Sequence, residues 1–377
     1  MANFKIAIVY DWIDKWGGVE RILLTLSEIF PNADFYTSIY DPIKAPWAKD
    51  LNIKTSYMQR LPDKIKKNRI LSIPFYPFAF ENFNFNNYDL VISVTSSFAK
   101  GIITKPETKH ICILLTPSRF LWLYSHLYMP ADYQSLFWGY LQYLKKWDLA
   151  AANRPDSIIT ISKTVQKRTK KIYKRDSEVI YPPFDFSYWG KIKQQITKNK
   201  IQTNPNFHLP ISNFYLVVSR LEPYKRIDLV VETFNQLSNK NLIIIGKGTK
   251  LKYLKSIAKS NISFLQDLTD QELATYYQNA TALIMPQEED FGYTALEAQY
   301  FGCPVISYHQ GGANDTIIEN KIGLFFDSQD TKSLIKIITQ FEKNAKNLKR
   351  LTLVNGIINC QKFDKKIFKD KIIEVIK

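Results

Sequence analysis

The chain of 377 residues is long enough for two domains, because a domain typically holds about 100–200 residues. Its hydrophobic content of 45% and aromatic content of 14% exclude an intrinsically disordered chain. Three widely separated cysteines exclude a disulfide-stapled scaffold and indicate free thiols in a reducing compartment. The formal net charge of +16 favours a nucleic acid or an anionic membrane surface as a partner, although solubility alone also accounts for it.

No segment of the sequence predicts a membrane span. Residues 6–9 form an apolar run that is too short for the apolar region of a signal peptide. No stretch approaches the roughly 18 apolar residues of a spanning helix. We therefore expect a cytoplasmic protein that is soluble or only peripherally attached to a membrane.

The first half of the chain alternates short apolar runs with amphipathic segments. Residues 4–10 predict a buried strand, and Gly17-Gly18 then opens residues 19–30, whose apolar side chains recur at helical spacing. Continuous β-branched runs are typical of parallel strands that are buried on both faces. Further runs of this kind predict strands at residues 90–94, 111–115, 157–162 and 179–181.

A change of composition then divides the chain. Residues 185–213 are rich in Lys, Gln, Asn and Pro and lack a sustained apolar period, so we interpret them as a linker. The alternation restarts after them. Strands are predicted at residues 214–219, 242–245, 262–265, 282–285, 305–308 and 324–326, and helices at residues 227–237, 251–258 and 272–278.

Two successive runs of alternating strands and helices predict two doubly wound α/β domains that face each other. We expect the first domain over residues 1–190 and the second over residues 205–361. Ligands of such sheets bind beyond the carboxyl ends of the strands. The cleft between the domains is therefore the expected site.

Two cations follow the first strand of the second domain. Arg220 comes directly after residues 214–219, and Lys225 follows five residues later. Cations just beyond the carboxyl end of a strand suit a phosphate or diphosphate group. Taken alone, such a pair is more often part of a solvated loop.

A second candidate group follows the strand at residues 282–285. Phe291-Gly292 places backbone N–H groups at the predicted start of a helix, an arrangement that binds anions. Glu297 lies in the first turns of that helix among small apolar residues, and a carboxylate there can accept hydrogen bonds from two hydroxyl groups. The alternative for Glu297 is an exposed helix position. Gly246-Lys247-Gly248 lacks the third glycine of a dinucleotide fingerprint, so we interpret it as a turn.

Together these motifs resemble the retaining glycosyltransferases of family 4. Glu289 and Glu297 have the E-x7-E spacing of that family, Arg220 and Lys225 match its Arg-x4-Lys pair, and Gly17-Gly18-Val19-Glu20 resembles its N-terminal glycine loop. Further motifs over nearly the whole chain resemble a subgroup of bacterial surface-polysaccharide transferases, often mannosyltransferases. These motifs lie at residues 11–12, 40–42, 99–101, 116–119, 147–148 and 180–183.

The resemblance implies the GT-B fold, an α/β architecture of two facing Rossmann-like domains with an interdomain cleft. The N-terminal domain would lie on the acceptor side, the C-terminal domain would bind the nucleotide sugar, and a helix at about residues 362–377 would pack back on the N-terminal domain. The implied reaction moves a hexose, with mannose favoured, from a nucleotide-diphosphate sugar, with GDP-mannose favoured. The acceptor would be lipid-linked or an oligosaccharide, in cell-surface polysaccharide synthesis. No cofactor is implied.

The family's roles carry over to the matching residues. Arg220 and Lys225 would hold the donor diphosphate and stabilise its leaving charge, Glu289 would grip hydroxyls of the transferred sugar, and Glu297 would bind the ribose. No side-chain nucleophile is implied, because the departing phosphate would help to deprotonate the acceptor hydroxyl. The expected catalytic residues are Arg220, Lys225 and Glu289, and the expected substrate-binding residues are Gly17, Gly18, Arg119, Phe291, Gly292, Tyr293 and Glu297.

A metal is not expected, because the four histidines have no paired spacing and no Asp-x-Asp motif occurs. One position departs from the family: Leu115 stands where members commonly have the His of His-Thr-Pro. Leucine can neither donate a hydrogen bond nor carry charge, so we expect an altered sugar preference. The alternative is a non-catalytic transferase-like protein that binds a nucleotide sugar or glycan in a membrane-associated synthesis complex. An epimerase would need an acid–base pair that the sequence does not display.

Basic residues are concentrated at residues 163–175, which contain seven Lys or Arg and no acid. On a helix these cations would lie opposite an apolar face that includes Val165 and Tyr173. A second basic group at residues 64–69 precedes an aromatic run at residues 75–80. Basic and aromatic residues together suit an anionic bilayer, whereas a solvated helix and a core aromatic cluster are the alternatives. A lipid-linked acceptor favours peripheral attachment to the inner face of the cytoplasmic membrane, and no motif indicates a nucleic acid.

Overall fold

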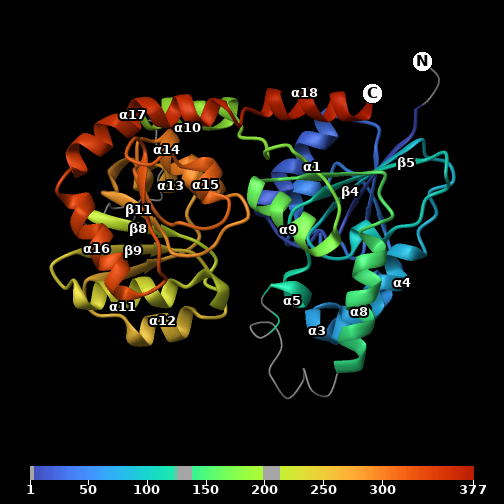
Figure 1. Cartoon of the computed structure of the whole chain (residues 1–377), viewed down its shortest axis with the longest axis horizontal. Helices are drawn as coiled ribbons and strands as arrows, with labels where there is room; N and C mark the ends of the chain where they lie inside the picture. The colour runs from blue at the N-terminus through green and yellow to red at the C-terminus, as the bar shows by residue number, and fades with distance from the viewer. Residues whose placement is uncertain (1–3, 124, 126–137, 198–212) are drawn as a thin grey trace. The chain divides into compact units, whose positions relative to one another are not determined.

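The computed structural model describes residues 4–123, 125, 138–197 and 213–377, and it divides the chain into two compact units (Figure 1). Unit 1 comprises Met1–Pro182 and Phe368–Lys377, and unit 2 comprises Pro183–Ile367. Each unit is built on one sheet in which every strand pair is parallel.

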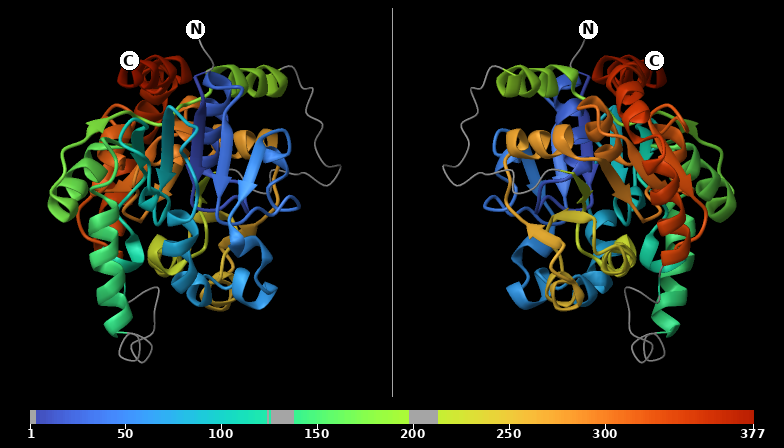
Figure 2. Two further views of the ribbon diagram at one scale, coloured as in Figure 1. Left: turned by 90° about the vertical axis from the view of Figure 1, so that its right-hand side faces the viewer. Right: turned by 90° about the vertical axis from the view of Figure 1, so that its left-hand side faces the viewer.

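The sheet of unit 1 has seven strands in the order β3-β2-β1-β4-β5-β6-β7, which stand side by side in the left view of Figure 2. Its middle is buried on both faces: all six residues of β4 are buried. This is the burial expected of a parallel sheet that is covered on both sides. The strands are β1 (Ile6–Tyr10), β2 (Asp34–Thr37), β3 (Asn52–Thr55), β4 (Leu90–Thr95), β5 (Lys109–Leu114), β6 (Ser157–Thr160) and β7 (Glu178–Val179).

Helices cover this sheet, and the last of them comes from the end of the chain. Helix α18 (Lys365–Ile376) is held on unit 1 by an ion pair between Lys369 and Glu28 at 2.7 Å, and by Lys109 Nζ, which donates to the carbonyl oxygen of Val375 at 2.8 Å. The other helices of unit 1 are α1 (Gly18–Ile29), α2 (Asp63–Lys66), α3 (Arg69–Ser72), α4 (Tyr76–Glu81), α5 (Arg119–Trp122), α8 (Trp138–Ala151) and α9 (Lys163–Tyr173), with 3-10 turns η1 (Pro46–Ala48), η2 (Tyr57–Arg60), η3 (Ile73–Phe75) and η4 (Ala99–Gly101).

The sheet of unit 2 has six strands in the order β10-β9-β8-β11-β12-β13. They are β8 (Phe214–Val218), β9 (Asn241–Ile245), β10 (Ile262–Leu265), β11 (Ala282–Met285), β12 (Val305–Tyr308) and β13 (Gly323–Phe326). Two groups of helices pack on it, with α11 against α12 and α16 in one group and α13 and α14 against α10 and α17 in the other (Figure 1). These elements are α10 (Phe186–Thr197), η5 (Pro223–Lys225), α11 (Ile227–Gln236), α12 (Leu251–Ile257), α13 (Asp270–Asn279), α14 (Tyr293–Tyr300), α15 (Ala313–Thr316), α16 (Thr331–Glu342) and α17 (Ala345–Gln361).

Every strand predicted from an apolar run is present, which confirms the doubly wound α/β architecture. Strands β2 and β3 were not predicted. β3 is the edge of its sheet and none of its four residues is buried, so it has no apolar run. An edge strand needs only one partner and can be polar on both faces. β2 is buried at Phe35, Tyr36 and Thr37, but only two of its four residues are apolar, which is too short a run to mark a strand.

The prediction of a linker over residues 185–213 is wrong for its first part, because Phe186–Thr197 form helix α10. Trp189, Ile192 and Ile196 are its buried residues, and the Trp189 ring packs edge-on against Phe301 with centroids 5.7 Å apart. Their spacing of three and four residues marks one helical face. The lysines and glutamines of the other face concealed that period. Residues 198–212 of the expected linker lie outside the described residues.

Two expectations about the whole chain can be compared with the structure. The three cysteines are unpaired and buried, as the prediction of free thiols requires. Among the helices that the structure describes, none combines the length and apolarity needed to cross a bilayer.

Candidate functional site

The sheet of unit 2 has a topological switch point at β8, where the order in which successive strands are added to the sheet reverses. Strand β8 pairs with β9 on one side and with β11 on the other, so the loops after β8 and β11 lead away from each other. In open α/β sheets, ligands bind in the crevice beyond the carboxyl ends of such strands. Arg220 and Lys225 follow β8, and Glu289 follows β11. Both groups predicted from the sequence therefore lie at this switch point.

Lys225 and Glu289 form an ion pair at the switch point. Lys225 Nζ lies 2.5 Å from Glu289 Oε1, and the two side chains are only 9% and 16% exposed. A second donor reaches the same oxygen, because Gln287 Nε2 lies 2.6 Å from it. Lys225, the expected phosphate-binding cation, and Glu289, the expected sugar-binding carboxylate, are therefore in direct contact. A phosphate that approaches this site has to compete with the Glu289 carboxylate for the ammonium group of Lys225.

Arg220 is exposed, and its guanidinium carbon lies 5.9 Å from the centroid of the Tyr224 ring. Lys225 Nζ lies 5.5 Å from the same ring, so Tyr224 stands next to both cations. Within the described ranges Arg220 makes no ion pair, which leaves its charge accessible to an anion from solution.

Gly246 keeps the loop of Arg220 in place. A Cβ at Gly246, which has a φ of +154°, would lie 1.8 Å from the carbonyl oxygen of Ser219. The loop also donates from Leu221 N to the carbonyl oxygen of Lys247 at 2.7 Å. Any side chain at position 246 would push the loop away. Gly246-Lys247-Gly248 therefore has a packing role at the site, which fits its interpretation as a turn.

The start of helix α14 faces the same edge of the sheet. Gly292 begins the helix with a φ of +97°, and no side chain caps the helix. Phe291 beside it is 4% exposed and packs edge-on against Phe363. Gly311 approaches so closely that a Cβ there would lie 2.3 Å from the carbonyl oxygen of Glu289. The backbone of Gly311 and Gly312 therefore packs directly against that of Glu289, whose carbonyl oxygen accepts a hydrogen bond from Gly312 N at 2.6 Å.

Glu297 is 4% exposed, so it is not a solvated helix residue. Its Oε2 accepts a hydrogen bond from the hydroxyl of Tyr277 at 3.0 Å. Tyr277 is itself buried, and its ring stacks on Phe301 with centroids 6.4 Å apart. Burial, and then the negative charge of Glu297, raise the pKa of the Cys360 thiol, which keeps that thiol protonated. No sequence pattern indicates Tyr277, because it lies 20 residues from its partner Glu297.

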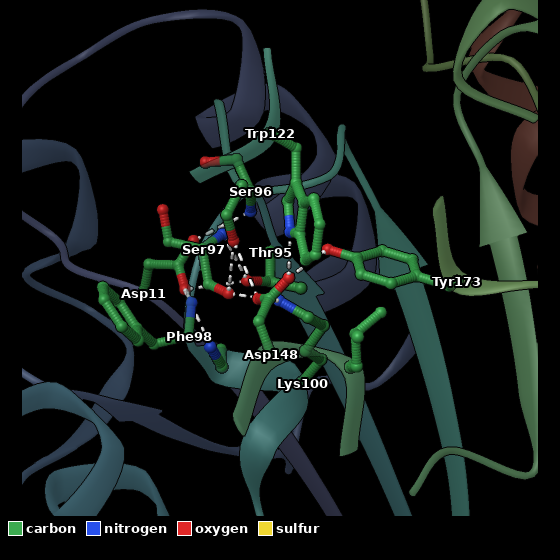
Figure 3. Close-up of polar contacts among 12 residues, drawn as sticks. Asp11, Thr95, Ser96, Ser97, Phe98, Lys100, Trp122, Asp148 and Tyr173 are labelled. Carbon is green, nitrogen blue, oxygen red and sulfur yellow. Dashed lines mark hydrogen bonds and ion pairs between the residues drawn. The ribbon is translucent and has the colours of Figure 1, made fainter. Parts of the chain in front are cut away.

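Unit 1 has an equivalent switch point between β1 and β4. Asp11 follows β1 and is fully buried. Its Oδ1 accepts hydrogen bonds from Thr95 Oγ1 and from the backbone N–H groups of Phe98 and Ala99, each at 2.8 Å, and its Oδ2 accepts one from Ser96 N at 2.9 Å (Figure 3). One carboxylate therefore holds the whole loop that follows β4.

A buried ion pair fixes the neighbouring loops. Lys100 and Asp148 are each 1% exposed and lie 2.5 Å apart. Asp148 also accepts hydrogen bonds from Ser118 Oγ at 2.9 Å, from Trp122 Nε1 at 2.7 Å and from the Tyr173 hydroxyl at 2.7 Å (Figure 3). Burial, and then the charge of Asp148, raise the pKa of Tyr173, so the phenol remains a donor. One sign of this network is present in the sequence, because Lys100 and Asp148 are the charged residues of the motifs at residues 99–101 and 147–148.

The site residues expected in unit 1 lie at this same carboxyl edge. Gly17 precedes the start of α1, which no side chain caps. Leu115 directly follows β5, is 5% exposed and donates from its backbone N–H to the carbonyl oxygen of Thr95 at 2.8 Å. Arg119 is half-buried and opens α5, four residues after Leu115. The expected residues therefore form two groups, one at the carboxyl edge of each sheet.

Comparison with known proteins adds to this geometry. Residues 200–353 match the family described as "Glycosyl transferases group 1". All the site residues expected in unit 2 lie inside this group 1 region.

Two curated relatives resemble the chain over part of their length. It is 24% identical over 245 residues to the alpha-1,3/1,6-mannosyltransferase ALG2 of Dictyostelium discoideum, a match that covers 57% of this chain and 58% of that protein. It is 27% identical over 134 residues to the GDP-mannose-dependent alpha-(1-6)-phosphatidylinositol monomannoside mannosyltransferase of Mycolicibacterium smegmatis, which covers 31% of this chain and 35% of that protein. The matches thus span only about half or less of these relatives.

A solved structure matches the whole chain. Anabaena Alr3699/HepE in complex with UDP-glucose has a TM-score of 0.68 and 17% identity, and the match covers 98% of this chain and 99% of that one. At this identity the likeness shows the fold alone. The GT-B fold predicted from the sequence is thereby confirmed, and the match to glycosyl transferases group 1 confirms the predicted resemblance to the glycosyltransferases of family 4.

Proposed function

We propose that this protein is a glycosyltransferase that moves a hexose from a nucleotide-diphosphate sugar to a lipid-linked or oligosaccharide acceptor in cell-surface polysaccharide synthesis. The observation that carries the proposal is the group at the β8–β11 switch point, where Lys225 Nζ lies 2.5 Å from Glu289 Oε1 and Arg220 stands exposed beside them. Two cations and a carboxylate at one crevice suit a ligand that joins a diphosphate to a polyhydroxylated sugar.

Mannose is the favoured sugar, and GDP-mannose is the favoured donor. Both curated relatives described above are named as mannosyltransferases, and the name of one specifies dependence on GDP-mannose. Leu115, at the carboxyl end of β5 in unit 1, is a buried apolar residue at the position where the glycosyltransferases of family 4 commonly have a histidine. The panel of donors used in the test therefore includes other bases and sugars.

The mechanism assigns a separate task to each side chain. Arg220 and Lys225 hold the diphosphate and stabilise the charge that develops on it when the glycosidic bond breaks. Glu289 orients the hydroxyls of the transferred sugar, and Glu297 binds the ribose. The departing phosphate accepts the proton of the acceptor hydroxyl, which attacks from the same face, so the configuration of the sugar is retained. Positioning and fixed charge provide the acceleration, and the reaction needs no metal.

We also propose that the protein works at the inner, cytoplasmic face of the membrane, where a lipid-linked acceptor is accessible. Helix α9 presents Lys163, Lys167, Lys170, Lys171 and Lys174 as exposed residues. The second basic group contributes less charge, because Lys66 and Lys67 both pair with Asp63, at 3.1 and 2.5 Å. Its contribution is apolar: Leu71 and Phe78 are 52% and 53% exposed.

The test is a thermal-shift screen of GDP-, UDP-, ADP- and dTDP-sugars with the wild type and with Arg220→Ala. A ligand that binds only the folded state raises the unfolding temperature by mass action. We expect one donor class to stabilise the wild type and to lose most of that effect in the variant. Product analysis with a lipid-linked acceptor then separates transfer from binding. Stabilisation of the wild type by no donor would contradict the proposal, and binding without transfer would favour the non-catalytic alternative that Leu115 suggests.

A further inference from the structure

Gln287, which no sequence motif assigned, lies between β11 and Glu289 and is 2% exposed. Its Nε2 donates to Glu289 Oε1 at 2.6 Å. Its own Oε1 is buried and has no hydrogen-bond partner among the residues that the structure describes. The amide nitrogen of Gln287 therefore has a hydrogen-bond partner, Glu289, and its carbonyl oxygen has none among the described residues.

The carboxylate decides which way the amide points. If the amide were reversed, two oxygen atoms would face each other at 2.6 Å, so the donor side of Gln287 has to point at Glu289. This orientation leaves the carbonyl without a donor, and a buried acceptor without a donor destabilises the folded chain. Methionine would fill a similar volume without that penalty. Gln287 therefore holds the Glu289 carboxylate in its observed position, although its unpaired carbonyl oxygen lowers the stability of the folded chain.

Two donors of different kind converge on one oxygen. Lys225 Nζ is cationic, and Gln287 Nε2 is neutral, and both lie within 2.6 Å of Glu289 Oε1. In the proposed reaction Lys225 has to turn its charge toward the diphosphate, which removes one of these two donors from Glu289. A neutral amide is not attracted to a phosphate in this way and can remain on the carboxylate.

We propose that Gln287 is a positioning residue that keeps the Glu289 carboxylate in place when Lys225 engages the donor diphosphate. This inference rests on the proposed function, since it needs a bound nucleotide sugar. Gln287 acts through Glu289 and touches no reacting atom. It should therefore influence the handling of the sugar and leave the recognition of the nucleotide unchanged.

The test compares Gln287→Met with Gln329→Met. Gln329, in the loop between β13 and α16, donates from Nε2 to the carbonyl oxygen of Pro286 at 2.7 Å, so the control removes a glutamine that contacts the loop of Gln287 without touching Glu289. We expect Gln287→Met to lower kcat about 10- to 100-fold, while the affinity for the free nucleoside diphosphate changes less than about twofold. The unfolding temperature should not fall. Gln329→Met should leave kcat within about twofold of the wild type.

A double-mutant cycle shows whether the effect passes through Glu289. In a Glu289→Gln background, Gln287→Met should cause no further loss of kcat, because the two residues act as a unit. An equal loss in both backgrounds, or wild-type kcat in Gln287→Met, would overturn the inference. A fall in unfolding temperature with equal loss of nucleotide and sugar recognition would show a merely structural role.

Calorimetry keeps the two proposals apart. The wild type should bind the nucleotide sugar more tightly than the free nucleoside diphosphate, and Gln287→Met should lose that difference. A wild type that binds neither ligand would overturn the proposed function and this inference together. A wild type that binds the nucleotide sugar, with a variant that keeps the full difference, would overturn only the role of Gln287.

Discussion

Arg220 and Lys225 carry the same charge in different surroundings. Lys225 is buried against a carboxylate, whereas Arg220 is exposed above the Tyr224 ring. A phosphate reaches Arg220 from solution without displacing a protein partner, but it reaches Lys225 only by replacing Glu289. Removing either cation should weaken the stabilisation of the leaving diphosphate, since a hydrogen bond between charged groups is stronger than one between neutral groups.

The first prediction concerns these two cations. Arg220→Ala and Lys225→Ala should each lower kcat at saturating donor by an amount equivalent to about 2–4 kcal/mol of transition-state stabilisation. Circular dichroism and thermal unfolding would check that the fold is intact. Lys336→Ala on α16, at an exposed position, is the matched control and should keep normal turnover. Near wild-type kcat in either site variant would exclude that residue from the donor site.

The second prediction separates the two glutamates. Glu297→Gln should weaken the binding of a nucleoside diphosphate without sugar, because the ribose loses a charged acceptor. Glu289→Gln should hardly affect that ligand and should mainly impair sugar transfer. Isothermal titration with the free nucleoside diphosphate measures the difference. Equal losses of affinity in both variants would show that the two carboxylates do not have separate tasks.

The third prediction concerns Leu115, which is 5% exposed at the carboxyl end of β5. An apolar wall disfavours a sugar whose hydroxyl would be buried there, since a buried hydroxyl without a partner costs about 1–3 kcal/mol. Leu115→His should therefore change the ranking of donor sugars while both proteins remain active. A donor panel with a lipid-linked acceptor mixture measures this. A wild type inactive with every donor, together with an active Leu115→His, would contradict the pocket role.

At the scale of elements, α9 has one face that is buried in unit 1 and one that is exposed. Val165, Thr169 and Tyr173 are buried in unit 1, and Tyr173 reaches Asp148 in the network that holds the loops of the carboxyl edge. The exposed lysines lie on the other side of the same helix, where Lys170 pairs with the exposed Asp176 at 2.6 Å. Exposed ion pairs contribute little to stability, so these charges are available for a surface.

The fourth prediction tests this helix. Binding to vesicles that contain anionic lipid should weaken as salt rises, because the screening length falls below about 10 Å above 0.1 M. Charge reversal of Lys167, Lys170 and Lys171 should release the protein. The control is charge reversal of Lys332, Lys336 and Lys343, which makes the same change in net charge at exposed positions of unit 2. If co-sedimentation with the vesicles depends neither on salt nor on the charge reversal in α9, the lysines of α9 do not bind the membrane and form only a solvated helix face.

For the molecule as a whole, His110 links stability to pH. It is fully buried on β5, with Nε2 2.8 Å from Ser93 Oγ, and burial lowers its pKa to about 3. In the unfolded chain the pKa is about 6.5. Between these values the unfolded state binds a proton that the folded state refuses, so stability falls as the pH drops below about 6.5.

The fifth prediction follows from this difference. On going from pH 7.5 to 5.5, the wild type should lose about 1.4 kcal/mol more unfolding free energy than His110→Gln, which cannot titrate at this position. Denaturant unfolding at the two pH values measures the loss for each protein. The comparison cancels the other titrating groups, which both proteins share. Identical losses would show that His110 takes up its proton in the folded state.

Local sequence patterns were sufficient to predict the two doubly wound sheets and all the described strands except β2 and β3. A strand in the middle of a parallel sheet is buried on both faces, so a short apolar run of neighbouring residues marks it. Arg220, Lys225 and Glu297 were singled out by their places beside predicted strands and helices, and Glu289 by the resemblance to the glycosyltransferases of family 4. Helix α10 was not predicted, because few of its residues are apolar and its exposed face is rich in lysine and glutamine.

The side chains that hold these residues in place can be identified only in the folded chain. Glu289 meets Lys225 across 64 residues, Glu297 meets Tyr277 across 20, and Asp11 meets the N–H group of Ala99 across 88. Such partners share no local pattern, because their pairing depends on the order of strands in the sheet. Gln287 is the clearest case: it lies two residues from Glu289, yet only its burial and the direction of its amide gave it a role. Burial is a property of the packed chain, and no spacing of residues encodes it.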